Sequence, residues 1–502
     1  MISRNILLIL ILTIAALLRF YQLGHNPPEL YVDEVSNGYN AYSILKTARD
    51  EYGNFLPLTF RAFGDYNPAL SVYLLVPAIV VFGLNEFAVR FPSALLGTLT
   101  VLLTYFLAKK LFEETKYKFS IAHISALLLA ISPWHLQFSR YDHEANFMVF
   151  FVVLGTTLFL FSKNNYRILV LSAISFAATL NTYQGAKIWV PVILMALVLI
   201  YKKQLLKWKL KLLIPALIVI VGAIPIVTNL QQSTIRARSA GIFEKEEPVK
   251  LFISGYLSHF SPNFLFVTPD NIGRHSIPGM GHLYIFELPL ILAGIIFAIR
   301  SKTPHKKFLF AWLLLAPIPA ALATPTPHAL RSITFLPIFS ILAAIGLVAI
   351  ITARTSFKFK ATLLAGLAIV AAYNMVTYFH LYYKHYPKLK AADWNDGHKE
   401  MVEYVDSIKD NYEVIAVSNY YGHPYIFVLF YSKYDPAAYH SQSQDKTKFD
   451  KFEFFGASWD KKVAGTALVV RPHWQKPDPP PKYIKEIYDT ADTLVFRISE
   501  EE

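Results

Sequence analysis

The chain contains no cysteine among its 502 residues, and few of its residues carry a charge. The absence of cysteine excludes disulfide bonds, thiol catalysis and metal sites built from thiolates. Charged residues make up 17% of the chain and hydrophobic residues 54%, and the mean hydropathy of +0.37 is well above that of a soluble domain. Neither a GxGxxG nor a Walker A sequence is present, so no nucleotide site is expected. This composition predicts a protein that crosses a membrane several times.

Apolar runs recur along the first 380 residues, most of them near the ~20 residues that cross a bilayer as a helix. We expect about eleven spans, the first of them a retained anchor because it lacks a convincing cleavage site. A further run at 69–83, bounded by Pro68 and Gly83, is expected to lie along the outer interface without crossing. The expected spans are 5–23, 90–108, 119–137, 147–162, 168–181, 188–201, 212–228, 284–300, 308–323, 332–351 and 361–380.

Positive charge indicates which ends of these spans face the cytoplasm. With a cytoplasmic N-terminus and a non-crossing 69–83, five short inner loops carry 18 Lys and Arg residues, as the positive-inside rule requires. These loops also account for much of the net charge of +13, and no basic nucleic-acid recognition motif is present. The acidic and histidine-bearing loops are therefore expected to share the outer face of the membrane. The inner loops are 109–118, 163–167, 202–211, 300–307 and 354–360.

The chain changes in character near residue 385. We expect two domains, a transmembrane module at 1–384 and a small extracytoplasmic α/β domain at 385–502. The proline-rich stretch KPDPPPKY (476–483) predicts a turn or linker. Within the tail, KEMVEYVDSIKD (399–410) predicts a helix, and strands are expected at VIAVSN (414–419), YIFVLFY (425–431), TALVV (466–470) and TLVFRI (493–498).

Two adjacent acidic residues, Asp33 and Glu34, follow the first apolar run in the segment ELYVDEVSNGYNAY. Carboxylates rarely lie against a membrane unless they handle ions, protons or polar substrates. An apolar boundary raises the proton affinity of a carboxylate toward the operating pH. The alternative is structural: Asp33 caps the helix that follows, and Glu34 lies in its first turn.

A second polar group lies in the loop SRYDHEAN (139–146), which carries Arg140, Asp142, His143 and Glu144. These side chains suit contact with a polar substrate or with a divalent cation. On a regular helix the three potential ligands cannot all face one ion, so the sequence leaves the metal unknown. The remaining alternative is a solvated loop that binds nothing.

Five longer segments carry a resemblance, and they occur in the chain in this order: LLRFYQLGHNPPELYVDEVSNGYNAYSILKTARDEYG (17–53), RFPSALLGTLTVLLTYFLAKKLF (90–112), SPWHLQFSRYDHEAN (132–146), YLSHFSPNFLFVTPDNIGRHSIPGMGHLY (256–284) and PHALRSITFLPIFSILAAIGL (327–347). They resemble the lipid-phosphosugar-dependent glycosyltransferases of the GT-C superfamily, in particular the bacterial relatives of protein O-mannosyltransferases and of the aminoarabinose transferase. The likeness covers most of residues 1–380 and only loosely the tail. No single segment is as diagnostic as a P-loop, but five ordered matches form a joint signal.

The resemblance implies an α-helical polytopic membrane protein of the GT-C type, with a juxtamembrane helix in its first outer loop. It implies an enzyme of the cytoplasmic membrane whose active site faces outside. The enzyme transfers a sugar, most commonly mannose in the family, from a polyprenyl-phosphate carrier to a hydroxyl of a protein, lipid or glycan. The reaction is a single inverting displacement. No cofactor is certain, and a divalent cation stays open.

The alternative from another class is a transporter or a lipid-carrier flippase, which also has many spans. Such proteins usually show paired repeats and ionisable residues near the midplane, whereas here the charges cluster outside.

The family assigns a role to the acidic residue that matches Asp33, which takes the proton from the acceptor hydroxyl. Glu34 is then expected to orient the acceptor or to tune Asp33 through like-charge coupling. The donor phosphate gains negative charge as it leaves, and arginine is its natural partner. The expected phosphate clamp is His328 with Arg331, which share a helical face if the helix begins there. Further phosphate candidates are Arg236, Arg238 and Arg274 with His275, whereas His143, His259 and His282 are expected to be structural or to contact the acceptor.

Overall fold

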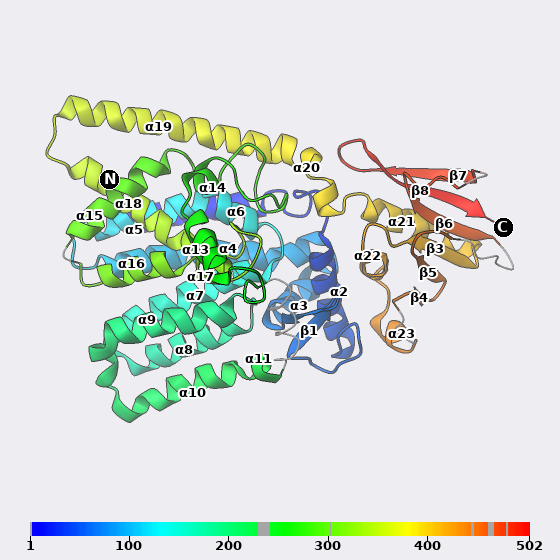
Figure 1. Cartoon of the computed structure of the whole chain (residues 1–502), viewed down its shortest axis with the longest axis horizontal. Coiled ribbons are helices and arrows are strands. Elements are labelled where there is room, and N and C mark those ends of the chain that lie inside the picture. The colour runs from blue at the N-terminus through cyan, green and yellow to red at the C-terminus, as the bar shows by residue number, and fades with distance from the viewer. Residues whose placement is uncertain are drawn as a thin grey trace. The chain divides into compact units, whose positions relative to one another are not determined.

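The computed structural model describes residues 3–228, 241–301, 303–442, 446–459, 466–477 and 480–501 (Figure 1). These residues form two compact units, each assembled from three segments of the chain. The predicted boundary near residue 385 lies close to the last passage of the chain between the units, after Leu381. The second unit, however, also contains two segments from the first 92 residues. The first unit comprises Met1–Tyr21, Asp65–Ser71 and Ser93–Leu381, and the second Gln22–Gly64, Val72–Pro92 and Tyr382–Glu502.

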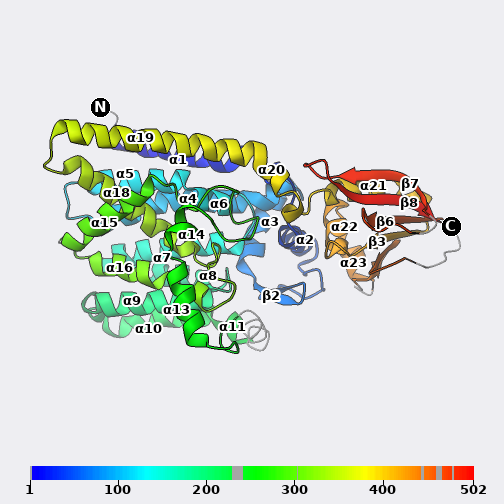
Figure 2. The ribbon, with the colours of Figure 1, turned by 45° about the horizontal axis from the view of Figure 1, so that its top comes forward.

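The first unit is almost entirely helical. Its long helices run side by side, and α19 lies along one side of them (Figure 2). Its elements are α1 Arg4–Phe20, β2 Asp65–Pro68, most of α4 Glu86–Leu111, α5 Lys118–Ile131, α6 Pro133–Ser139, α7 Glu144–Phe161, α8 Tyr166–Leu180, α9 Ala186–Leu206, α10 Leu213–Gly222, α11 Ile224–Thr228, α13 Pro248–Ser258, α14 Pro262–Phe266, α15 Glu287–Arg300, α16 Lys306–Leu315, α17 Ile318–Ala321, α18 Leu336–Thr352 and α19 Phe357–His380.

Six helical stretches of the described chain are long and apolar enough to cross a membrane. A seventh span results if α5 and α6, which meet at an angle of 59°, are counted as one broken span. This count is lower than the predicted number of about eleven spans. The other four expected runs form the helices α1, α8, α15 and α16, which are too short to be counted by this length criterion. The six stretches are Glu86–Leu111, Glu144–Asn164, Ala186–Leu206, Lys209–Val227, Ile333–Thr352 and Phe357–Leu389. The chain is thus a multi-pass membrane protein.

The apolar run at 69–83 forms the helix α3, Leu70–Phe82. Its 13 residues give a length of about 20 Å, which is short of the ~30 Å hydrocarbon core of a bilayer. Since other expected spans also form short helices, length does not decide whether α3 crosses, and its place along the outer interface stays a prediction.

Helices α15 and α18 approach each other closely through two glycines. A Cβ on Gly294 would lie 1.9 Å from the carbonyl oxygen of Leu342, and one on Gly346 would lie 1.8 Å from that of Leu290. Small residues allow such backbone contact between membrane helices, where burial of apolar side chains gives little net driving force. α18 thereby becomes the most buried of the six long apolar stretches, and it positions the loop that precedes it.

The second unit combines α2 Val32–Thr47 with a six-stranded mixed sheet in the order β4-β5-β3-β6-β8-β7. The central strand β3 pairs in parallel with β5 and β6, whereas β8 is antiparallel to β6 and β7. Helix α2 packs against α22. The elements are β1 Thr59–Ala62, α20 Tyr386–Leu389, α21 His398–Ile408, β3 Val414–Ser418, α22 Pro424–Tyr431, α23 Pro436–His440, β4 Lys448–Phe449, β5 Phe452–Phe455, β6 Ala467–Pro472, β7 Lys482–Tyr488 and β8 Leu494–Glu501.

The tail agrees with most of the expected elements. The helix near 399–410 and the strands at VIAVSN, TALVV and TLVFRI are confirmed as α21, β3, β6 and β8. The strand expected at YIFVLFY is wrong, because this run forms the helix α22 with Pro424 in its first turn. A proline at a helix start is pre-organised for the helix, and a short apolar run buried on all sides has no period that separates strand from helix.

Candidate functional site

The start of α2 is fixed by a buried ion pair between Arg90 and Glu34. The ion pair is bidentate: Arg90 Nε lies 3.0 Å from Oε1 of Glu34, and Arg90 Nη2 lies 3.1 Å from Oε2. Both side chains are fully buried. The remaining guanidinium hydrogens go to the carbonyl oxygens of Leu23, Pro27 and Glu29. Both carboxylate oxygens of Glu34 are thus engaged by Arg90, which gives Glu34 a structural role, and its expected part in orienting the acceptor or tuning Asp33 stays a prediction.

Glu34 also closes the first turn of α2. Its Oε2 accepts the N–H of Tyr31 at 3.1 Å, and Tyr31 is the N-cap residue. Asp33 is the second residue of the helix and is half-buried. The alternative that Asp33 caps α2 is therefore wrong, since the cap lies two residues earlier. Asp33 remains the candidate for chemistry at this position.

The segment at 140–144 serves mainly to join helices. Arg140 is buried and donates to the carbonyl oxygens of Leu18, Arg19 and Tyr21 at the end of α1, where the last carbonyl groups of a helix have no partner within the helix itself. His143 Nδ1 accepts the N–H of Ala145 at 3.2 Å and so caps α7. Arg140 and His143 are thus engaged by backbone groups, and their expected contact with a substrate or a divalent cation stays a prediction.

The two acidic residues of the same segment are buried beside these caps. Asp142 is 2% exposed, and Glu144, in the first turn of α7, is 8% exposed with a carboxylate oxygen 3.3 Å from His143 Nδ1. The solvated-loop alternative is wrong for this segment.

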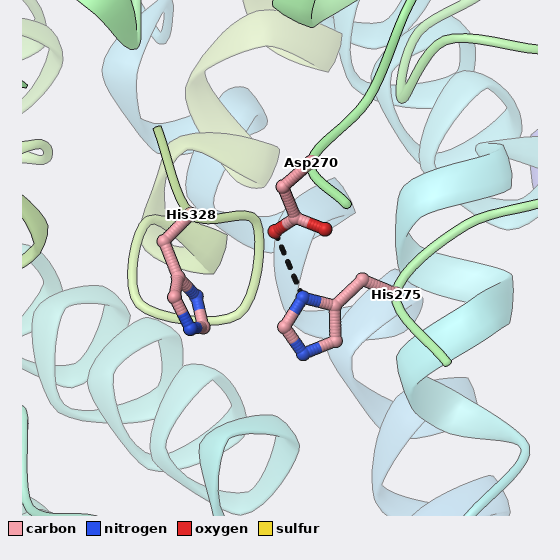
Figure 3. Close-up of side chains that lie close together, drawn as sticks. All are labelled: Asp270, His275 and His328. Carbon is pink, nitrogen blue, oxygen red and sulfur yellow. Dashed lines mark hydrogen bonds and ion pairs between the residues drawn. The ribbon is translucent and has the colours of Figure 1, made fainter. Parts of the chain in front are cut away.

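A cluster of Asp270, His275 and His328 forms in the loops of the first unit. Figure 3 shows the three side chains converging from two loops, and one ligand atom from each lies within 4.8 Å of the other two. Asp270 Oδ2 accepts a hydrogen bond from His275 Nδ1 at 2.8 Å and another from the N–H of Ala329 at 2.7 Å. His275 was a candidate from sequence, but Asp270 was missed. Its only sequence signal is its place in TPDN, five residues before His275.

The loops of this cluster are held by α6. Gln137 Nε2 donates to the carbonyl oxygen of Arg274 at 2.8 Å, and Trp134 Nε1 donates to that of Ala329 at 3.2 Å. Trp134 is fully buried and also packs against the ring of His282. Side chains of α6 thus hold the backbone of both loops that carry the cluster.

Burial keeps the imidazoles of His328 and His259 neutral at pH 7. Burial, and then the charge of Arg331, lowers the pKa of His328 to about 2, and burial lowers the pKa of His259 to about 4. Burial opposes ionisation of Asp270, but the hydrogen bonds from His275 and Ala329 outweigh it and lower the pKa of Asp270 to about 2. A neutral imidazole can still donate one hydrogen bond to a phosphate, so the part of His328 in the clamp stays a prediction.

His328 and Arg331 lie in a turn and not on a helix, because α18 begins only at Leu336. Arg331 Nη1 donates to the carbonyl oxygen of Thr324 at 2.9 Å, and its N–H lies 3.4 Å from His328 Nδ1. Arg274 is half-buried in the neighbouring loop. The two other arginine candidates, Arg236 and Arg238, lie outside the described residues.

A cavity of about 340 Å³ with mixed polar and apolar walls adjoins the cluster. Asp270 and His328 lie on its wall together with the hydroxyl and amide side chains of Ser258, Ser261, Asn263 and Thr268. The site thus combines a buried carboxylate, a neutral imidazole and an opening large enough for a polar ligand.

Comparison with known proteins supports the resemblance. The family of dolichyl-phosphate-mannose-protein mannosyltransferases matches residues 9–240. YkcB of Bacillus subtilis (strain 168), named as a candidate mannosyltransferase, is 27% identical over 157 residues, which are 31% of this chain and 20% of YkcB. The chain spans 20–39% of the length of the curated relatives it matches.

Two solved structures share the fold. The oligosaccharyltransferase AglB of Archaeoglobus fulgidus, in complex with an inhibitory peptide and a dolichol-phosphate, aligns with a TM-score of 0.55 at 15% identity, covering 86% of this chain and 63% of AglB. ArnT of Cupriavidus metallidurans bound to undecaprenyl phosphate aligns with a TM-score of 0.55 at 12% identity, covering 98% and 97% of the two chains. The chain therefore shares its fold with these two structures, and its residues 9–240 are similar to the mannosyltransferase family.

Proposed function

We propose that this protein transfers one sugar from a polyprenyl-phosphate carrier to a hydroxyl of an acceptor outside the cytoplasmic membrane. The observation that carries the proposal is the match of residues 9–240 to the mannosyltransferase family, a range that includes Asp33 and the segment 140–144. The fold shared with ArnT, whose structure holds undecaprenyl phosphate, supports the class of donor. Mannose is the proposed sugar, and the acceptor is a protein, lipid or glycan.

The proposed reaction is a single displacement that inverts the anomeric carbon. The acceptor oxygen attacks this carbon from the side opposite the phosphate, the carbon–oxygen bond to the phosphate breaks, and its electron pair leaves with the polyprenyl phosphate. Asp33 takes the proton of the acceptor hydroxyl. Its place in the first turn of α2, fixed by Arg90 and Glu34, supports this role, because a base must be held within hydrogen-bond reach of its proton.

The growing charge on the phosphate needs a cation, and Arg331 is the proposed one. A guanidinium can bind two phosphate oxygens at once, and such charge-assisted hydrogen bonds strengthen as the leaving group gains charge. The other candidates for binding the donor phosphate are Arg274, Arg236 and Arg238. The 18 basic residues of the five expected inner loops support an active site on the outer face.

The test is an assay of the purified full chain with labelled polyprenyl-phosphate mannose and a mixture of extracted envelope acceptors. The proposal predicts release of polyprenyl phosphate together with a labelled glycosylated product. A donor that moves between the leaflets of reconstituted vesicles but stays intact would instead identify a flippase.

A further inference from the structure

We propose that Asp270, His275 and His328 form a binding site for one divalent transition-metal ion, with Zn²⁺ the best match. No residue of this trio was expected to bind a metal from the sequence. The proposal concerns metal binding alone and does not depend on glycosyl transfer.

The three side chains offer the kinds of ligand atom that zinc prefers. One carboxylate and two imidazoles are the ligands of open zinc sites, whereas a set rich in carboxylates would favour Ca²⁺ or Mg²⁺. The ligand atoms lie within 4.8 Å of one another, and tetrahedral zinc ligands are ~3.3 Å apart at ordinary bond lengths. Small rotations of three side chains therefore suffice to bring them around one ion.

The three side chains are buried, and a backbone N–H group orients one of them. The side chains of Asp270 and His275 are each 5% exposed, and His328 is 6% exposed. These side chains already make hydrogen bonds to one another or to the backbone, and one cation could bind all three at once while they stay buried. The Ala329 N–H that donates to Asp270 Oδ2 gives the carboxylate the kind of support that orients metal ligands in proteins.

His259 fixes the backbone beneath the third ligand. Its Nδ1 donates to the carbonyl oxygen of Gly255 at 2.6 Å, and its Nε2 accepts the N–H of His328 at 3.1 Å. Both ring nitrogens are thereby used by the main chain. His259 is a positioning residue, and the three neighbours in the cluster are the ligands.

The adjoining cavity leaves one side of the ion open. Asp270 and His328 both line the space of about 340 Å³, so a bound ion would face it with fewer than four protein ligands. Three protein ligands and an open position distinguish sites that hold a water or an exchangeable ligand from closed structural sites. We therefore expect the ion to exchange and to be removable by a chelator without unfolding.

The experiment measures Zn²⁺ binding to the full chain, stripped with a chelator and freed of any histidine tag, by calorimetric titration and by metal content. Wild type is expected to bind one Zn²⁺ per chain. Asp270→Asn and His328→Gln should each weaken the affinity by at least ~10–100-fold, the range that even supporting residues of metal sites show. In the Asp270→Asn protein the amide oxygen can take the place of Oδ2 and still accept from both the Ala329 N–H and His275 Nδ1, so this variant should stay folded.

The matched control is His473→Gln, which removes an exposed histidine of the second unit and should bind Zn²⁺ as wild type does. Cobalt provides a second readout, because Co²⁺ held by these ligands absorbs visible light and the Asp270→Asn protein should lose that band. Absence of stoichiometric binding by wild type, or equal affinity in the His328→Gln and wild-type proteins, would overturn the site and leave only a hydrogen-bonded Asp–His pair. Neither measurement uses a sugar donor, so the result is independent of the transfer assay.

Discussion

Arg90 is the single residue on which the start of α2 most depends. It is fully buried, binds both oxygens of Glu34 and ties three carbonyl groups of the segment 23–29. A buried charge that loses its partner costs far more than an exposed one, because it cannot recover the hydration it gave up.

Glu34→Gln is therefore expected to lower the free energy of unfolding by about 3–5 kcal/mol, since it leaves the Arg90 charge buried without a counterion. The measurement is thermal unfolding of the purified protein in detergent. Glu403→Gln is the matched control. Glu403 is exposed, at 4.0 Å from Lys399, and its loss should change stability by less than ~1 kcal/mol. Equal stabilities of the two variants would show that the ion pair is not structural.

Arg331→Ala is expected to raise the apparent KM for the lipid donor more than that for the acceptor. Arg331→Lys should lower the KM for the lipid donor only part of the way back to the wild-type value, because an ammonium group cannot form the bidentate contact of a guanidinium. Steady-state kinetics with each substrate varied in turn give the comparison. An unchanged KM for donor in Arg331→Ala would remove this residue from the phosphate site and transfer its role to Arg274, Arg236 or Arg238.

Single residues also show what the sequence could and could not predict. The position of Asp33 beside the first span was readable, because it needs only an apolar run and a carboxylate. The roles of Glu34 and Arg140 were not, since their partners Arg90 and the end of α1 are 56 and about 120 positions away in the chain. Asp270 was missed because one aspartate in a turn is commonplace, and only the fold brings His328 to it.

At the scale of helices and strands, the pair α15 and α18 depends on its two glycines. Gly346→Ala places a methyl group on the carbonyl of Leu290, so the helices must separate. We expect a loss of about 1–3 kcal/mol from this overpacking. Gly366→Ala in α19 is the matched control, because a Cβ there meets no atom within 4 Å. Thermal unfolding of both variants gives the test, and a Gly346→Ala protein as stable as Gly366→Ala would contradict the close contact.

The helix α21 was predictable from its amphipathic period. Three strands of the tail were predicted instead from short apolar runs separated by Gly, Pro and Asp, and this weaker signal failed at YIFVLFY. YIFVLFY has seven consecutive apolar residues, which fit a buried strand as well as a buried helix. In the structure this run is the helix α22 and packs against α2, a contact that cannot be read from the sequence. Gly38 is part of that packing, since a Cβ there would lie 2.7 Å from both Phe430 and Val89.

At the scale of the whole molecule, the sequence predicts the sidedness of the chain from charge alone. Reporters fused after residues 115, 206, 304 and 357 are expected to be cytoplasmic, and one fused after 385 is expected outside, because the basic loops stay inside. Phosphatase and fluorescent-protein fusions measure this. A cytoplasmic reporter at 385 would mean that 69–83 crosses the bilayer or that another span was miscounted, and the candidate loops would no longer share one face.

The central claim, that Asp33 removes the acceptor proton during glycosyl transfer, is tested most directly by the turnover of Asp33→Asn. Asn keeps the size of the side chain but cannot take the proton, so turnover of labelled donor should fall by ~10²–10⁴-fold. Stability should change by no more than ~1 kcal/mol, because Tyr31 and not Asp33 is the cap of α2, and an acidic charge in the first turn of a helix is a small contribution. A monodisperse Asp33→Asn protein that works within a few-fold of wild type would contradict the claim.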